Sequence, residues 1–213
     1  MLTINEIFHS IQGESTRAGE PCVFVRLTAC DLRCSWCDTA YAFYEGQKRT
    51  VEDVVAEVDG YGCPLVEVTG GEPLLQEDVY PLMRDLVAHG HIVMLETGGH
   101  LPTARVPSEV VKIVDVKCPG SGESAKNHWP NLETLLPHDE VKFVVRDRED
   151  YEFARDVVAR HHLASRCAAV LVSPVHGVMD PAALSAWILE DRLPVRVQLQ
   201  LHKLIWPGVA RGV

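Results

Sequence analysis

The chain has 213 residues, of which 46% are hydrophobic and 23% are charged, a composition typical of one soluble globular domain. A formal net charge of −10 without a long Lys/Arg run argues against nucleic acid or an anionic membrane as partner. The N-terminus is neither a signal nor a transit peptide, and no apolar stretch approaches the roughly 20 residues that span a bilayer. We therefore expect a single domain over residues 1–213, located in the cytoplasm.

Short β-branched runs, typical of strands, alternate along the chain with amphipathic helical patterns. In chain order they are a strand over residues 22–28, a helix over 51–59 after an N-cap at Thr50, a strand over 65–69, a helix over 77–89 ending at Gly90, strands over 92–96, 111–117 and 141–145, a helix over 149–161, a strand over 169–173, a helix over 181–191 and a strand over 195–199. Residues 6–14 read as a loop or an edge strand. This alternation predicts an α/β fold with a parallel sheet, and because a closed eight-fold barrel needs about 250 residues, we expect an open or partial (β/α) barrel.

Polar and glycine-rich segments follow most of the predicted strands. They cover residues 29–39, 70–73, 97–100, 119–124 and 174–177. Because the carboxyl ends of parallel strands meet at one edge of a sheet, we expect these segments to form one site.

Three of the seven cysteines lie within eight residues, at Cys30, Cys34 and Cys37. The spacing Cys-x3-Cys-x2-Cys lets three thiols converge from one loop on a small metal centre, and an iron–sulfur cluster held by three thiolates keeps one iron open for a non-protein ligand. A structural zinc site is the alternative, and it would need a distant fourth ligand such as Cys63 or His9.

This spacing, with Trp36 before the last cysteine, resembles the radical S-adenosylmethionine superfamily. The strand-to-turn segment Val68–Pro73 contains Gly70-Gly71-Glu72, whose glycines let the backbone approach a ligand and offer N–H groups. Alone it is better explained by a tight turn, but in the superfamily such a segment holds the amino group of the methionine part of the cofactor, which points to Gly71.

Two charged residues lie within or at the ends of predicted strands. Arg26 interrupts an apolar strand, so it either forms an ion pair with Glu14, Glu72 or Glu96 or grips an anionic substrate group. Lys117 shares a face with Asp115, and the alternatives are a plain ion pair or a contact with the cofactor.

A narrower resemblance is carried by the order of four segments: Ser10-Ile11-Gln12-Gly13-Glu14, Cys37-Asp38-Thr39, Thr69-Gly70-Gly71-Glu72-Pro73 and Gln200-Leu201-His202-Lys203. Together they resemble the 7-carboxy-7-deazaguanine synthase family. The resemblance implies a shortened, modified partial (β/α) barrel with parallel strands, and usually a homodimer. It implies a carbon–nitrogen lyase of the radical S-adenosylmethionine superfamily that converts 6-carboxy-5,6,7,8-tetrahydropterin into 7-carboxy-7-deazaguanine, with loss of ammonia, for deazapurine nucleosides such as queuosine. The reduced cluster would cleave S-adenosylmethionine to a radical that takes hydrogen from C6 of the pterin and later returns it, with electrons from a donor such as flavodoxin or ferredoxin.

The resemblance also implies a role for each matching residue. The [4Fe-4S] cluster would be held by Cys30, Cys34 and Cys37, and Mg²⁺ by Thr39, which by itself reads as a turn or cap residue. S-adenosylmethionine would contact Trp36, Cys37, Asp38, Gly71, Lys117, Ser173, Pro174, Val175 and His176. The pterin would contact Ile11, Gln12, Gly13, Arg26, Thr69 and the terminal carboxylate of Val213. Some members have Ser-Pro-Lys near the fourth strand end, where this chain has Lys117-Cys118-Pro119, so the sequence departs from the family pattern there.

Two other functions share part of this pattern. A radical enzyme that activates a protein has the same cysteine spacing, but many such enzymes carry a cysteine-rich insertion that this chain lacks. A non-enzymatic zinc or iron–sulfur binding module needs neither the glycine turn nor Arg26.

Overall fold

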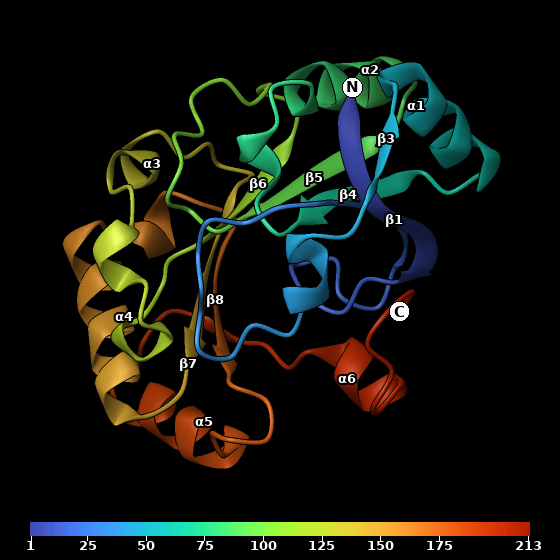
Figure 1. Ribbon diagram of the computed structural model, residues 1–213. Coiled ribbons are helices and arrows are strands. Elements are labelled where there is room, and N and C mark those ends of the chain that lie inside the picture. The colour runs from blue at the N-terminus through green and yellow to red at the C-terminus, as the bar shows by residue number, and fades with distance from the viewer.

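A single open sheet of nine strands forms the centre of the computed structural model, which describes residues 1–213 (Figure 1). The strand order is β3-β1-β2-β4-β5-β6-β7-β8-β9. The strands are β1 (Leu2–Ile11), β2 (Pro21–Leu27), β3 (Gln47–Arg49), β4 (Leu65–Gly70), β5 (Ile92–Thr97), β6 (Val111–Asp115), β7 (Glu140–Val145), β8 (Ala169–Pro174) and β9 (Arg196–Val197). All pairs from β2 to β9 are parallel, whereas β1 is antiparallel to both β2 and β3. Because β3 and β9 are separate edges, the predicted α/β partial barrel is confirmed.

Five helices follow one another around the outside of the sheet, and a short sixth lies apart from them near the C-terminus (Figure 1). They are α1 (Val51–Gly60), α2 (Val79–Ala88), α3 (Pro130–Glu133), α4 (Arg148–Arg160), α5 (Pro181–Glu190) and α6 (Leu201–Ile205). Single 3₁₀ turns are η1 (Ala40–Phe43), η2 (Pro73–Leu75), η3 (Pro119–Ser121), η4 (Ser124–Lys126) and η5 (Leu163–Ser165). The predicted cap of α1 is confirmed, because the Thr50 hydroxyl accepts a hydrogen bond from the Asp53 N–H at 3.1 Å. No helix is long and apolar enough to cross a membrane.

Two apolar clusters fix the sheet against its helices. One joins β1, β2, β4 and β5 to α1 and α2, and the other joins β7 and β8 to α4 and α5. Both strand faces of β4 are buried, as expected for a central parallel strand. This packing leaves the loops after the strands free to build a site.

The sequence prediction was wrong for the first and last strands. The segment expected as a loop or edge strand is the ten-residue β1, which lies inside the sheet. A register shift between Ile4 and Glu6 breaks its two-residue alternation, which explains why the pattern was missed. β9 has only two residues rather than five, and β6 ends at Asp115 rather than at residue 117.

Candidate active site

A cavity of about 680 Å³ opens over the carboxyl ends of the parallel strands. Its walls include side chains from β2, β4, β5, β6 and β7, the loop after β2, and the C-terminal segment. All but two of the predicted site residues line it. These residues are Ile11, Gln12, Gly13, Arg26, Cys30, Cys34, Trp36, Cys37, Asp38, Thr39, Thr69, Gly71, Lys117, Val175, His176 and Val213. The other two, Ser173 and Pro174, are buried within β8 and do not line the cavity.

The cysteine loop contributes three thiols to the cavity, the number that a cluster with one open iron requires, but the structure does not gather them into a preformed metal-binding group. Cys30 and Cys34 are half-buried and Cys37 is exposed, and all three line the cavity. None of the other four cysteines lines it, and neither does His9, so the cavity offers no fourth thiol and neither residue named for a zinc site. Burial raises the pKa of Cys30 and of Cys34 above the usual value of a thiol.

The glycine turn after β4 packs directly against the start of the cysteine loop. Ala29 has a φ of 82°, and its carbonyl accepts a hydrogen bond from the Glu72 N–H at 2.8 Å. A Cβ on Gly71 would lie 2.3 Å from the Ala29 oxygen and 2.7 Å from the Cβ of Cys30, so only glycine allows this approach. The expectation that the turn offers free N–H groups was wrong, because the Gly71 N–H is bound to the Leu27 carbonyl. The Gly71 carbonyl accepts no backbone hydrogen bond.

The segment after β6 holds the middle of the cysteine loop. The Glu123 carboxylate accepts a hydrogen bond from the Arg33 N–H at 2.6 Å. Ser35 donates its hydroxyl to the Gly120 carbonyl at 2.8 Å and its N–H to the Ser121 carbonyl at 3.0 Å. The sequence pattern predicts residues 119–124 at the edge of the site but gives no sign that they support the cysteine loop.

The C-terminal segment joins the loop after β1 to the cysteine loop. The Leu201 N–H donates to the Gly13 carbonyl at 3.0 Å, and Gln200 donates to Glu14 at 2.9 Å. Lys203 forms a 2.6 Å ion pair with Asp38, beside the third cysteine. Burial opposes ionisation of Asp38, but Lys203 lowers the pKa of that carboxyl to about 2. The four segments that carry the family resemblance are therefore in mutual contact around one cavity.

Arg26 forms an ion pair, but with a partner that was not predicted. Its Nε donates to Glu6 at 2.8 Å rather than to Glu14, Glu72 or Glu96, because β1 pairs with β2 and puts Glu6 opposite Arg26. The guanidinium also lies 5.6 Å from the Phe8 ring centroid and 5.9 Å from that of Tyr41. Its two terminal nitrogens make no hydrogen bond within the chain.

Buried charged side chains also line the cavity, and the sequence pattern does not predict that they contact one another there. Lys142 on β7 contacts Glu14 at 2.5 Å and Glu96 at 2.7 Å. Burial alone would lower the pKa of Lys142, but these carboxylates raise it well above its usual value. Burial raises the pKa of Glu67, which accepts a 2.5 Å hydrogen bond from the Gln12 amide. Both faces of β4 and β7 are buried, so neither strand shows an alternation of apolar and polar residues that would mark Glu67 or Lys142 as site residues.

Lys117 and Asp115 form the plain ion pair that the sequence allowed, at 2.6 Å. The Lys117 N–H is held by the Asn127 side chain at 2.9 Å, just beyond the end of β6. Both charged residues nevertheless line the cavity, so the ion pair and a contact with a ligand are compatible.

Comparison with known proteins identifies the class of enzyme to which the chain belongs. The model of the radical SAM superfamily matches residues 25–119, which include the cysteine loop and the glycine turn. The crystal structure of QueE from Escherichia coli superimposes with a TM-score of 0.73, at 22% identity over 93% of each chain, which shows a shared fold. Streptococcus suis SuiB bound to S-adenosylmethionine gives a TM-score of 0.59 at 12% identity, over 85% of this chain and 51% of that one. The fold and the family match are those of a radical S-adenosylmethionine enzyme.

Relatives of similar length identify the family. A 7-carboxy-7-deazaguanine synthase of Koribacter versatilis is 50% identical over the whole of both chains. One from Chlorobaculum tepidum is 46% identical over 100% of this chain and 97% of its own. One from Thermoplasma acidophilum is 36% identical over 98% of this chain and all of its own. The chain belongs to the 7-carboxy-7-deazaguanine synthase family, as the sequence motifs predicted.

Proposed function

We propose that this chain converts 6-carboxy-5,6,7,8-tetrahydropterin into 7-carboxy-7-deazaguanine with loss of ammonia, as a carbon–nitrogen lyase, in a pathway to queuosine or a related deazapurine. The observation that carries the proposal is the meeting of the cysteine loop, the glycine turn, Arg26 and the C-terminal segment around one cavity. A cavity of about 680 Å³ is within the usual size of ligand sites.

The substrate carboxylate is assigned to Arg26. Glu6 occupies only the Nε of this side chain, so the two terminal nitrogens remain for two parallel hydrogen bonds to a carboxylate. The Gln12 amide is fixed, since its nitrogen donates to Glu67 and its oxygen accepts from the Glu14 N–H at 3.0 Å. Gln12 would therefore offer the pterin one remaining N–H, beside Ile11, Gly13 and Thr69.

The cluster and the cofactor are assigned to neighbouring residues of the same cavity. Cys30, Cys34 and Cys37 would hold a [4Fe-4S] cluster, which supplies the electron that cleaves bound S-adenosylmethionine. The free carbonyl of Gly71 would accept a hydrogen bond from the cofactor's amino group. Five other predicted contacts of the cofactor line the same space: Trp36, Asp38, Lys117, Val175 and His176. Ser173 and Pro174 are buried in β8, so they would act only by holding that strand in place.

Two further groups complete the proposed site. The Thr39 hydroxyl, which donates to Asp38 at 2.9 Å and makes no capping bond to η1, would offer its oxygen to Mg²⁺. The terminal carboxylate of Val213 would accept the paired N–H donors of the pterin. The homodimer and an electron donor such as flavodoxin or ferredoxin stay predictions of the family resemblance, and the cytoplasmic location stays a prediction from the sequence.

The test is the stoichiometry of the anaerobic reaction with reductant, S-adenosylmethionine, Mg²⁺ and the pterin. We expect 7-carboxy-7-deazaguanine and ammonia in equal amounts, with S-adenosylmethionine not consumed. Cleavage of S-adenosylmethionine without either product would favour an enzyme that activates a protein. A loaded cluster with neither product nor cleavage would favour a binding module.

A further inference from the structure

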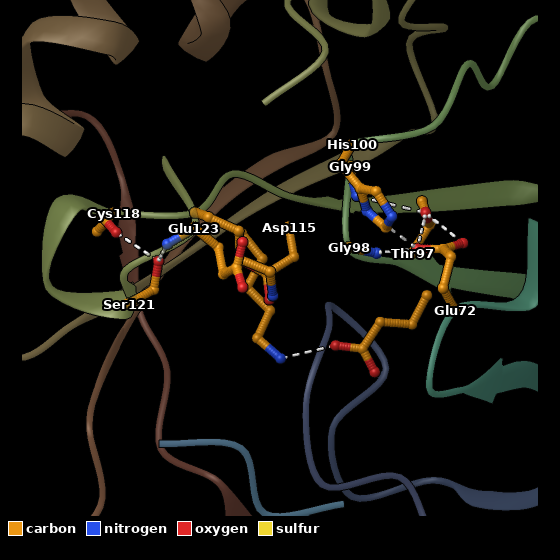
Figure 2. Close-up of polar contacts among 12 residues, drawn as sticks. Glu72, Thr97, Gly98, Gly99, His100, Asp115, Cys118, Ser121 and Glu123 are labelled. Carbon is orange, nitrogen blue, oxygen red and sulfur yellow. Dashed lines mark hydrogen bonds and ion pairs between the residues drawn. The ribbon is translucent and has the colours of Figure 1, made fainter. Parts of the chain in front are cut away.

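His100 bridges the glycine turn and the cysteine loop from a third element, the loop after β5. Its Nε2 lies 2.6 Å from the Asp31 carboxylate, one residue after Cys30. Its Nδ1 lies 3.7 Å from the Glu72 carboxylate, beyond hydrogen-bond distance, so the ring packs against Glu72 without a hydrogen bond, and its side chain is only 4% exposed. Figure 2 shows the His100 ring beside Thr97, Gly98 and Glu72.

Glu72 is held firmly in place and gives the His100 ring a fixed surface to pack against. The residue is fully buried, and its carboxylate accepts hydrogen bonds from the Gly98 N–H at 2.8 Å and the Thr97 hydroxyl at 2.9 Å (Figure 2). It also accepts one from the Leu74 N–H at 3.0 Å. A Cβ on Gly98 would lie 3.2 Å from both Glu72 and the His100 ring, so the glycine leaves room for the ring. The ring is therefore held against the end of β5, while its far nitrogen meets the loop that carries the cysteines.

The glycine turn and the segment after β6 hold the cysteine loop on either side of Asp31, whose side chain contacts His100. The glycine turn binds the backbone at Ala29, and the segment after β6 binds it at Arg33 and Ser35. Between these anchors the one hydrogen bond that joins two side chains is that of His100 with Asp31. The backbone carbonyls there accept from long side chains, that of Cys30 from Arg33 at 2.8 Å and that of Asp31 from Lys126 at 3.3 Å.

We propose that His100 is a positioning residue for the iron–sulfur cluster, which braces the Asp31 segment against the Glu72 turn and so fixes the thiol of Cys30. The inference rests on the proposed function only in requiring a cluster on the three cysteines. Supporting residues just outside a metal site commonly change metal affinity by about 10- to 100-fold when removed. Because His100 acts through the loop rather than on a ligand, we expect the lower end of that range.

The experiment measures iron release from the anaerobically reconstituted protein to a ferrous chelator. His100→Ala and Asp31→Ala should each release iron about tenfold faster than the wild type. The double variant should be no faster than either single variant, because both remove one link. Asp31→Asn, which keeps an acceptor for the ring N–H, should stay within about twofold of the wild type.

A matched control lies at the other end of the same strand. His91 directly precedes β5 and makes a 2.8 Å contact with Asp59, with a side chain that is 10% exposed. His91→Ala therefore removes a histidine–aspartate pair of similar geometry far from the cysteines, and we expect wild-type iron release.

Three outcomes would overturn the inference. Release at the wild-type rate from Asp31→Ala, whose half-exposed side chain is safe to remove, would overturn it even if His100→Ala failed to fold. Equal acceleration by His91→Ala would also overturn it, since the effect would then be general destabilisation. A wild type that takes up no cluster would overturn the proposed function first and this inference with it.

Discussion

Replacing Arg26 by lysine keeps the positive charge but removes the planar fork. The arginine has one nitrogen bound to Glu6 and two free, whereas a lysine has a single ammonium to share between Glu6 and the substrate. One charge-assisted hydrogen bond is lost, at about 1.5–3 kcal/mol. This corresponds to an increase in KM of roughly 10- to 150-fold, with kcat little changed, because the carboxylate is not the reacting atom.

The assay follows 7-carboxy-7-deazaguanine by mass under anaerobic conditions over a range of pterin concentrations. Arg17→Lys is the control, since Arg17 also pairs with a glutamate, Glu20, at 2.9 Å but does not line the cavity. An Arg26→Lys variant whose KM stays within about twofold of the control would refute the assignment of the substrate carboxylate to this residue.

Three further changes test the site's construction. Glu72→Ala leaves the Leu74 and Gly98 N–H groups without their acceptor and should lower the free energy of unfolding of the metal-free chain by about 3–5 kcal/mol in urea, whereas exposed Glu77→Ala should change it little. Lys203→Met removes the partner that lowers the pKa of Asp38 from 3.8 to about 2. Because Asp38 is 48% exposed, screening limits the loss to about 1 kcal/mol. This loss should be complete at pH 6 and vanish as pH falls from about 4 towards 2, since the stabilisation requires the ionised carboxylate. A short tag after Val213 should raise KM for the pterin at least about tenfold, and an unchanged KM would exclude the terminal carboxylate from the site.

The sequence predicted the parts of the molecule that depend on local pattern. Parallel strands are buried on both faces, so each appears as a β-branched run, and each is followed by a polar segment where the site forms. This is why the sequence predicts the cysteine loop and the glycine turn at one edge of the sheet. The ion pair of Lys117 with Asp115 followed from the two-residue period of a strand.

Contacts between distant segments were not predictable in the same way. The partner of Arg26 depends on the pairing of β1 with β2, and the register shift in β1 hides that strand from a test of alternation. His100 carries no periodic signal, and only the fold brings it to Asp31, 69 residues earlier. The buried Lys142 with its two carboxylates was missed for the same reason, because its partners come from β5 and the loop after β1.

The most direct test of the central claim compares the wild type with Cys34→Ala after identical anaerobic reconstitution with iron and sulfide. With reductant, S-adenosylmethionine, Mg²⁺ and 6-carboxy-5,6,7,8-tetrahydropterin, the wild type should form 7-carboxy-7-deazaguanine, detected by mass, and the variant should form none. Product from Cys34→Ala equal to that of the wild type would contradict the role of the three-cysteine loop. Absence of product from a wild type with a full cluster would contradict the proposed reaction.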